Sequence, residues 1–169
     1  MRLSNSAAIV LIFATVFAPA HAASVEGIRI LAQGVYTCDR AASTPDPRSP
    51  TGMRPHVNRC RLDSETSTIV ARLGTSFGCT AQPWGITQRG HDNSVAIDVR
   101  FRYPVGVKSP FTGKTHYWDD TSVRLEMGAS WPFTFSFEEN FELMPGNWAV
   151  ELWSGGHKFN ECRFTVVLP

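Results

Sequence analysis

The chain has 169 residues, of which 43% are apolar and 18% are charged. This balance is too apolar for a disordered chain, and the length suits a single domain. The 16 Lys and Arg side chains nearly balance the 15 Asp and Glu side chains, so no strong positive field marks a nucleic-acid-binding protein.

The N-terminal segment, residues 1–22, has the pattern of a secretory signal peptide. Arg2 precedes an apolar run over 7–18, and small residues then occupy the two positions that signal peptidase recognises, Ala20 and Ala22. As a helix this run would span about 18 Å against about 30 Å of hydrocarbon, which disfavours the alternative of an uncleaved anchor. We therefore predict cleavage after Ala22, a single domain over 23–169, and a secreted or periplasmic protein that is not integral to the membrane.

Four cysteines, Cys38, Cys60, Cys79 and Cys162, follow the predicted signal peptide. They contain no C-x-x-C pair, which argues against a zinc site and against a redox-active dithiol. Three pairings are open in principle, and export favours disulfides. Cys79 and Cys162 alternate in phase with apolar neighbours and should face inward from two facing sheets. We predict the disulfides Cys38–Cys60 and Cys79–Cys162.

Period-two alternation of apolar and polar residues dominates the rest of the chain and is typical of half-buried antiparallel strands. The strong runs are 95–103, 133–137, 148–153 and 164–168, and weaker runs are 28–38, 66–71, 76–81 and 117–127. Gly- and Pro-containing turns separate them, and residues 154–157 should close a hairpin. The pattern predicts an all-β, antiparallel two-sheet sandwich of seven or eight strands, stapled by disulfides.

One segment, 39–59, departs from this pattern. It is rich in Pro, Arg, Ser and Thr and has no apolar alternation. We expect it to form a long irregular loop that a Cys38–Cys60 bridge would close at its base.

The C-terminal strands resemble a family of exported bacterial proteins known only as a domain of unknown function. The resemblance is carried by a Pro-Gly-x-Trp strand within 143–153 and a Phe-Thr-Val strand at 164–166. Three further segments fit the same family: 30–36, 73–78 and 110–114. It implies no catalytic residues. A weaker similarity, in the Leu-x-Pro-Gly-x-aromatic turn at 143–148, is to fibronectin-type and immunoglobulin-like sandwiches, and such likeness of fold does not imply a function.

Aromatic side chains supply the first candidate binding surface. Trp153 lies on the polar face of its predicted strand, opposite the core-facing Trp148, where it could stack on a sugar or peptide or else pack under a loop. Tyr117 and Trp118 are adjacent, so one ring should face outward unless the pair closes one end of the core. The other tryptophans, Trp84 and Trp131, are expected to pack inside.

Arginines supply the second candidate surface. The segment 39–59 and its flank contain Arg40, Arg48, Arg54, Arg59 and Arg61, and a second pair, Arg100 and Arg102, shares one strand face. Guanidinium groups suit bidentate contacts with phosphate or carboxylate, so the patch could meet lipid head groups or an acidic glycan. Alternatively, these charges complement the acidic segment 119–151 within the fold.

Signals of catalysis are weak. No G-x-S-x-G motif occurs, and the adjacent carboxylates Asp119 and Asp120 should point to opposite faces of a strand. We predict no enzyme, no cofactor and no metal, and a module that binds an envelope protein or glycan. Two alternatives stay open: a hydrolase or metal-dependent enzyme using His116, Asp119 and Asp120, and a structural part of an envelope assembly joined by strand pairing.

Overall fold

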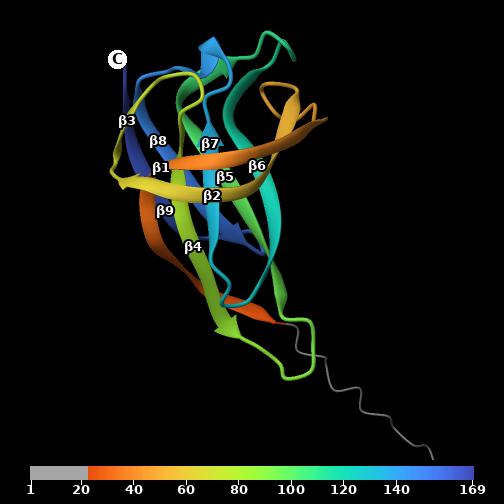
Figure 1. Cartoon of the computed structure of the whole chain (residues 1–169). Coiled ribbons are helices and arrows are strands. Elements are labelled where there is room, and N and C mark those ends of the chain that lie inside the picture. The colour runs from red at the N-terminus through yellow and green to blue at the C-terminus, as the bar shows by residue number, and fades with distance from the viewer. Residues whose placement is uncertain (1–22) are drawn as a thin grey trace, which may run out of the picture.

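The computed structural model describes residues 23–169, so the predicted signal peptide lies outside the described residues. Within 23–169 the chain forms nine strands and one short 3-10 helix, η1 (Asn140–Glu142). The strands make two sheets that face one another (Figure 1). No helix in this part of the chain is long and apolar enough to cross a membrane.

The first sheet has four strands in the order β2-β1-β4-β7, all paired antiparallel. In chain order these strands are β1 (Ser24–Pro45), β2 (Met53–Glu65), β4 (Ser76–Ile86) and β7 (Trp131–Ser136).

The second sheet has five strands in the order β3-β9-β8-β5-β6. They are β3 (Thr68–Val70), β5 (Ser94–Lys108), β6 (Thr115–Glu126), β8 (Gly146–Ser154) and β9 (His157–Val167). Only the short β3 pairs parallel, with β9; the other pairs in this sheet are antiparallel. The predicted antiparallel two-sheet sandwich is confirmed, as is the hairpin at 154–157 between β8 and β9.

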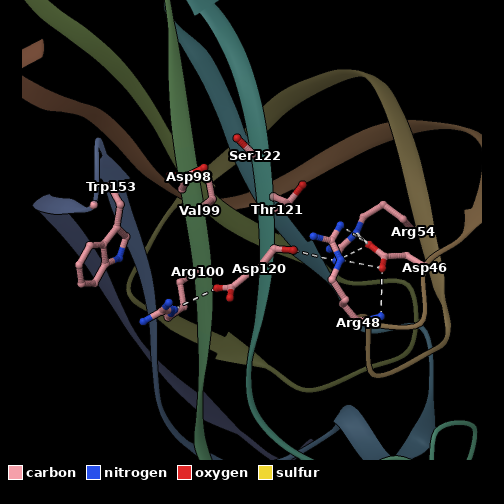
Figure 2. A pocket seen from close by; sticks show the side chains of 11 residues that line it. Asp46, Arg48, Arg54, Asp98, Val99, Arg100, Asp120, Thr121, Ser122 and Trp153 are labelled. Atoms are coloured by element: carbon pink, nitrogen blue, oxygen red, sulfur yellow. Dashed lines mark hydrogen bonds and ion pairs between the residues drawn. The ribbon is translucent and has the colours of Figure 1, made fainter. Parts of the chain in front are cut away.

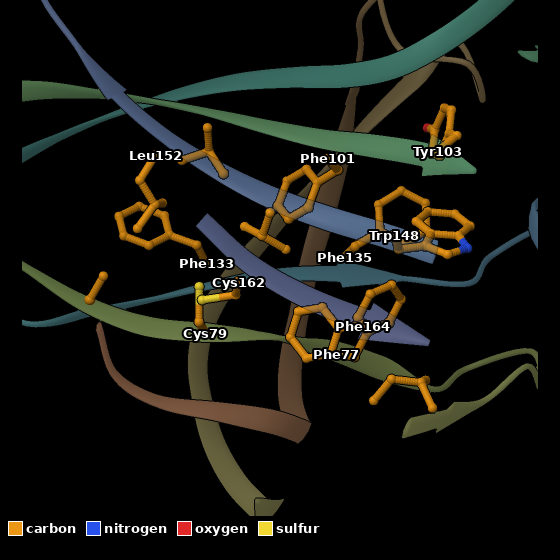
Figure 3. Packing of buried hydrophobic residues seen from close by; sticks show 14 of the residues in the cluster. Phe77, Cys79, Phe101, Tyr103, Phe133, Phe135, Trp148, Leu152, Cys162 and Phe164 are labelled. Atoms are coloured by element: carbon orange, nitrogen blue, oxygen red, sulfur yellow. The ribbon is translucent and has the colours of Figure 1, made fainter. Parts of the chain in front are cut away.

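Alternation in the sequence places the core as predicted. All five apolar positions of the run 95–103 are buried, and so are the phenylalanines of β7 and three inward-facing residues of β8, Trp148, Val150 and Leu152. Aromatic rings from both sheets meet at the centre (Figure 3): the Phe135 and Trp148 centroids are 5.1 Å apart, and those of Phe77 and Phe164 are 5.2 Å apart. Burial of these large rings supplies the main driving force for closing the two sheets.

The three tryptophans expected inside do not behave alike. Trp148 is buried and donates its indole N–H to the Met144 carbonyl at 3.0 Å. Trp84 and Trp131 are exposed, so their predicted packing in the core is wrong. Trp84 alternates with the buried Ala81 and Pro83 and therefore lies on the outer face of β4, whereas Trp131 is the first residue of β7.

One predicted disulfide is confirmed and the other is not formed. Cys38 and Cys60 lie opposite one another on β1 and β2 and are bonded. Cys79 on β4 and Cys162 on β9 are buried free thiols, although they face inward from opposite sheets as predicted (Figure 3). Parity along a strand fixes which way a cysteine points but not whether two facing thiols are oxidised.

The segment 39–59 is a strand hairpin, so the expectation of a long irregular loop is wrong. Strand β1 continues to Pro45 and β2 begins at Met53, which leaves only 46–52 as the turn. The outer part of this hairpin crosses in front of β7 toward β6 (Figure 1). Because that part lies outside the two-sheet core, backbone pairing holds it without the apolar alternation that would reveal a strand.

Candidate functional site

The outer face of the five-stranded sheet gathers aromatic and charged side chains around Arg100. Strand β5 lies between β8 and β6, and Arg100 is directly opposite Glu151 on one side and Asp120 on the other. Trp153 and Trp118 occupy the diagonal positions on these neighbouring strands. Diagonal neighbours across strands are within reach of long side chains, so the register alone brings this group together.

The Arg100 guanidinium interacts with both indole rings. Its central carbon lies 4.8 Å from the centroid of the Trp118 ring and 5.2 Å from that of Trp153. Both distances are within the range of cation–π attraction. The arginine thus links an aromatic side chain of β6 to one of β8 across the intervening strand.

Carboxylates fix the orientation of all three side chains. Arg100 Nε donates to Asp120 Oδ1 at 3.0 Å, and the indole N–H of Trp118 donates to Asp120 Oδ2 at 2.9 Å. The indole N–H of Trp153 donates to Glu151 Oε2 at 3.2 Å. The site is therefore held in one arrangement before any ligand arrives, which lowers the entropic cost of binding.

A groove of about 550 Å³ runs beside this cluster, from Trp153 across β5 and β6 to the tip of the β1–β2 hairpin (Figure 2). Asp98, Thr121 and Ser122 line its middle part. Asp98 is exposed and has no hydrogen-bond or ion-pair partner within the described residues. The volume lies in the usual range for small-ligand sites.

The hairpin tip closes the other end of the groove with an ion-pair network. Arg48 donates to Asp46 from its backbone N–H and its side chain, which lowers the pKa of Asp46 to about 2. Arg54 Nη2 lies 3.3 Å from Asp46 Oδ2. Asp46 is therefore ionised at neutral pH and matched by two guanidinium groups.

Arg54 also anchors the hairpin to β6. It donates to both carboxylate oxygens of Asp119, at 3.0 and 2.8 Å, and to the backbone carbonyl of Asp120 at 2.8 Å. Asp119 is buried, and desolvation raises its pKa despite the attraction of Arg54. The carbonyl contact also occupies part of the free edge of β6, which disfavours pairing of another strand there.

The residues predicted to form binding surfaces are only partly brought together. Trp153 and Arg100 line the groove, Arg54 lines its hairpin end, and Trp118 stacks on Arg100 beside it. The other three predicted residues lie elsewhere: Tyr117, Arg102 and Arg59.

Each of these three has its own surroundings. Tyr117 is exposed next to Trp118, with the two ring centroids 6.5 Å apart. Arg102 is in the same sheet and pairs with Glu151 at 3.6 Å. Arg59 is on β2 and lines a separate depression with Trp131, so the predicted arginines do not form one patch.

The residues of the alternative enzyme hypothesis do not converge. The His116 ring is hydrogen-bonded to the Thr112 hydroxyl, Asp119 is buried against Arg54, and Asp120 is exposed on the other face of β6. No group of three or more His, Cys, Asp or Glu able to hold a metal ion occurs in the described part of the chain.

Sequence reasoning missed several groove residues. Asp98 shares the strand face of Arg100 and lies two residues before it, so the alternation of β5 contained a usable signal. Asp46 had no such signal, because only the hairpin brings it near β6.

The sandwich is similar to a solved structure. It matches the crystal structure of an immunoglobulin-like protein from Pseudomonas aeruginosa with a TM-score of 0.53. The fold is immunoglobulin-like. The match covers 83% of this chain and 96% of the Pseudomonas chain at 21% sequence identity, which shows the fold alone. No family model and no curated protein matches the chain, so its resemblance to an exported family of unknown function stays a prediction.

Proposed function

We propose that this immunoglobulin-like domain is an exported, non-catalytic binding module whose outer groove takes an uncharged glycan of the cell envelope. The observation that carries the proposal is the placement of Arg100 between Trp118 and Trp153 beside an open groove. Stability of the sandwich does not require two indoles on its outer face. Large aromatic side chains held in place at the surface are typical of binding sites.

The chemistry of the groove suits a sugar chain. An indole presents a flat apolar surface that can stack on the C–H side of a sugar ring. Asp98, Thr121 and Ser122 line the same groove and offer carboxylate and hydroxyl groups to sugar hydroxyls. Few polar groups beside an apolar platform are the usual composition of a ligand site.

Charge matching favours an uncharged ligand over an anionic one. Arg48 and Arg54 have carboxylate partners in Asp46 and Asp119, and Arg100 has one in Asp120. The unmatched charge of the groove is the Asp98 carboxylate. An acidic glycan or a phosphate would have to displace these internal partners, which costs much of the binding energy. The hypothesis that the arginines complement the acidic segment 119–151 within the fold is therefore preferred for Arg54 and Arg100, whereas Arg48 is matched locally by Asp46.

Export is supported by the Cys38–Cys60 disulfide, because such bonds persist in oxidising compartments. The periplasm or the extracellular space would also bring the groove into contact with envelope glycans. An envelope protein is the second candidate partner, since an open groove rimmed by charges also suits a peptide segment.

Isothermal titration calorimetry with an uncharged N-acetylglucosamine tetramer tests the proposal, with an oligogalacturonate as the anionic comparison. We expect the uncharged oligomer to bind and the anionic one to bind at least tenfold more weakly. Trp153→Ala should weaken binding at least tenfold, whereas Trp84→Ala removes an exposed tryptophan outside the groove and should leave it unchanged. Preference for the anionic oligomer, or equal binding by the Trp153 variant, would contradict the proposal.

A further inference from the structure

The outer part of the β1–β2 hairpin, residues 38–60, forms a strap across one side of the sandwich (Figure 1). At its base, the sulfurs of Cys38 and Cys60 each lie 3.6 Å from the Thr134 hydroxyl of β7. At its tip, Arg54 binds Asp119 of β6. The strap is thus attached to the last strand of each sheet, and both sheets contribute to the space beneath it.

A pocket of about 380 Å³ lies under this strap. Phenylalanines of β5 and β7, Phe101, Phe133 and Phe135, line it from the sandwich, and Pro55 and Val57 line it from the strap. Arg54, Thr121 and Ser122 line both this pocket and the outer groove, so the two adjoin at the β6 edge. Phe101 and Asp119, however, alternate with Arg100 and Asp120 and lie on the inner face of the sheet.

One end of the pocket contains a buried carboxylate that lacks a cationic partner. Glu142 is 3% exposed, and its Oε2 accepts the backbone N–H groups of Glu138 and Glu139 at 2.7 and 3.0 Å. No ion pair to Glu142 is found among residues 23–169, whereas Asp119 nearby is matched by Arg54. Burial of an unmatched carboxylate is costly and raises the pKa of Glu142 to about 7.

Tyr103 is a second buried polar side chain without a partner, although it is not among the residues that line the pocket. The residue is 6% exposed, and its hydroxyl is fully buried with no hydrogen bond in the described part of the chain. Burial raises the pKa of this hydroxyl, and the charges of Asp119 and Glu142 raise it further. Orphaned buried hydroxyls are rare in folded proteins.

We propose that the pocket under the strap binds a small organic cation, a primary ammonium group attached to an aromatic or similarly flat apolar body. The ammonium group supplies the counter-charge that Glu142 lacks and can donate a charge-assisted hydrogen bond to its carboxylate. The apolar body packs on the phenylalanines, whose ring faces also attract cations. Apolar burial and charge pairing thus favour the same ligand class.

Phenethylamine is a suitable probe, and 2-phenylethanol is its matched uncharged control. Binding to the purified protein can be followed by calorimetry and by amide chemical shifts in NMR. At pH 8 we expect saturable binding of phenethylamine, at least tenfold weaker binding of 2-phenylethanol, and shift changes confined to residues near Phe101, Phe135 and Glu142. Equal binding of the two probes, or no saturable binding of the amine, would overturn the proposal.

Glu142→Gln keeps the size and the acceptor oxygen of the side chain but removes its charge, and should weaken amine binding at least tenfold. Glu65→Gln removes an exposed charge at the end of β2 and should have no effect. Amine binding should also weaken between pH 8 and pH 5.5 as Glu142 becomes protonated. The other titratable or charged side chains that line the pocket are Arg54, His56, Asp119 and Glu138, so loss of this pH dependence in the Gln variant assigns it to Glu142.

A variant that fills the pocket keeps the test independent of Glu142. Val57→Phe adds volume from the strap, where the side chain is only partly buried, and should abolish binding of the amine. Undiminished binding by both variants would place the amine elsewhere and would reject the site.

Discussion

Arg54 and Asp119 form a bidentate ion pair, with nitrogen–oxygen distances of 3.0 and 2.8 Å, between the β1–β2 hairpin and the edge strand of the opposite sheet. The two residues are 65 positions apart, and their side chains are only 18% and 11% exposed. This single contact positions the hairpin so that it closes the outer groove on one side and roofs the inner pocket on the other.

Removal of one partner of this pair should destabilise the protein strongly. In Arg54→Ala the Asp119 carboxylate stays buried without a counter-charge, and such losses typically cost about 3 kcal/mol. Urea denaturation at pH 7 measures the change. Arg163→Ala removes an exposed arginine paired with Glu161 and should cost less than about 1 kcal/mol. Similar losses in the two variants would show that the Arg54 pair is no more important than a surface pair.

Glu142 should make the protein less stable as pH rises toward neutrality. Its pKa is about 7 in the folded protein against an ordinary value of 4.5, so the folded state holds a proton that the unfolded state releases between these values. Stability from this group is therefore fully present below about pH 4.5 and is lost as pH rises through 7, by about 3 kcal/mol.

Comparison of wild type with Glu142→Gln isolates this contribution, because the other titrating groups are shared. Chemical denaturation at pH 5 and pH 8 should show a smaller decline for the variant than for wild type. Parallel declines would mean that Glu142 titrates near its ordinary value.

The number of free thiols distinguishes the two cysteine pairs. Cys79 and Cys162 are reduced, whereas Cys38 and Cys60 are bonded. Alkylation in denaturant without a reductant should therefore add two labels per chain, and four after reduction. In the folded protein these two thiols should react slowly, because both are buried and the pKa of Cys79 is raised by its contact with Cys162 and by desolvation. No label before reduction would show that the second pair is oxidised.

Two tryptophans of β8 should differ in their effect on stability. Trp148→Phe leaves a void among the rings around Phe135 and removes the donor to the Met144 carbonyl, which should cost about 2 kcal/mol. Trp153→Phe changes a residue on the outer face and should cost less than about 1 kcal/mol. Thermal unfolding followed by circular dichroism measures both, and a larger loss for the Trp153 variant would reverse the assigned roles.

The apolar pattern was sufficient for the sandwich and for its interior. In β5 the buried residues from Val95 to Tyr103 occupy every second position, because one face of the strand packs on the other sheet and the opposite face meets solvent. The same parity placed Trp153 on the outer face and Cys79 and Cys162 on the inner one.

The apolar pattern did not predict strands that lie outside the hydrophobic core. The hairpin arms around Arg54 are held by backbone pairing and by ion pairs, and neither leaves a periodic apolar signal. Two tryptophans were misassigned for a different reason. Trp84 and Trp131 are apolar in type, but Trp84 lies on the outer face of β4 and Trp131 is the first residue of β7.

The sequence by itself determined the all-β class and the inward and outward faces of the strong strands, because these depend on local alternation. Tertiary structure alone decided which outward residues meet. Arg100 joins Trp118 and Trp153 through the order of β8, β5 and β6, and Arg54 reaches the same groove because the β1–β2 hairpin is anchored to Asp119 of β6. The burial of Glu142, which raises its pKa, is likewise a property of the assembled fold. No local sequence pattern contains it.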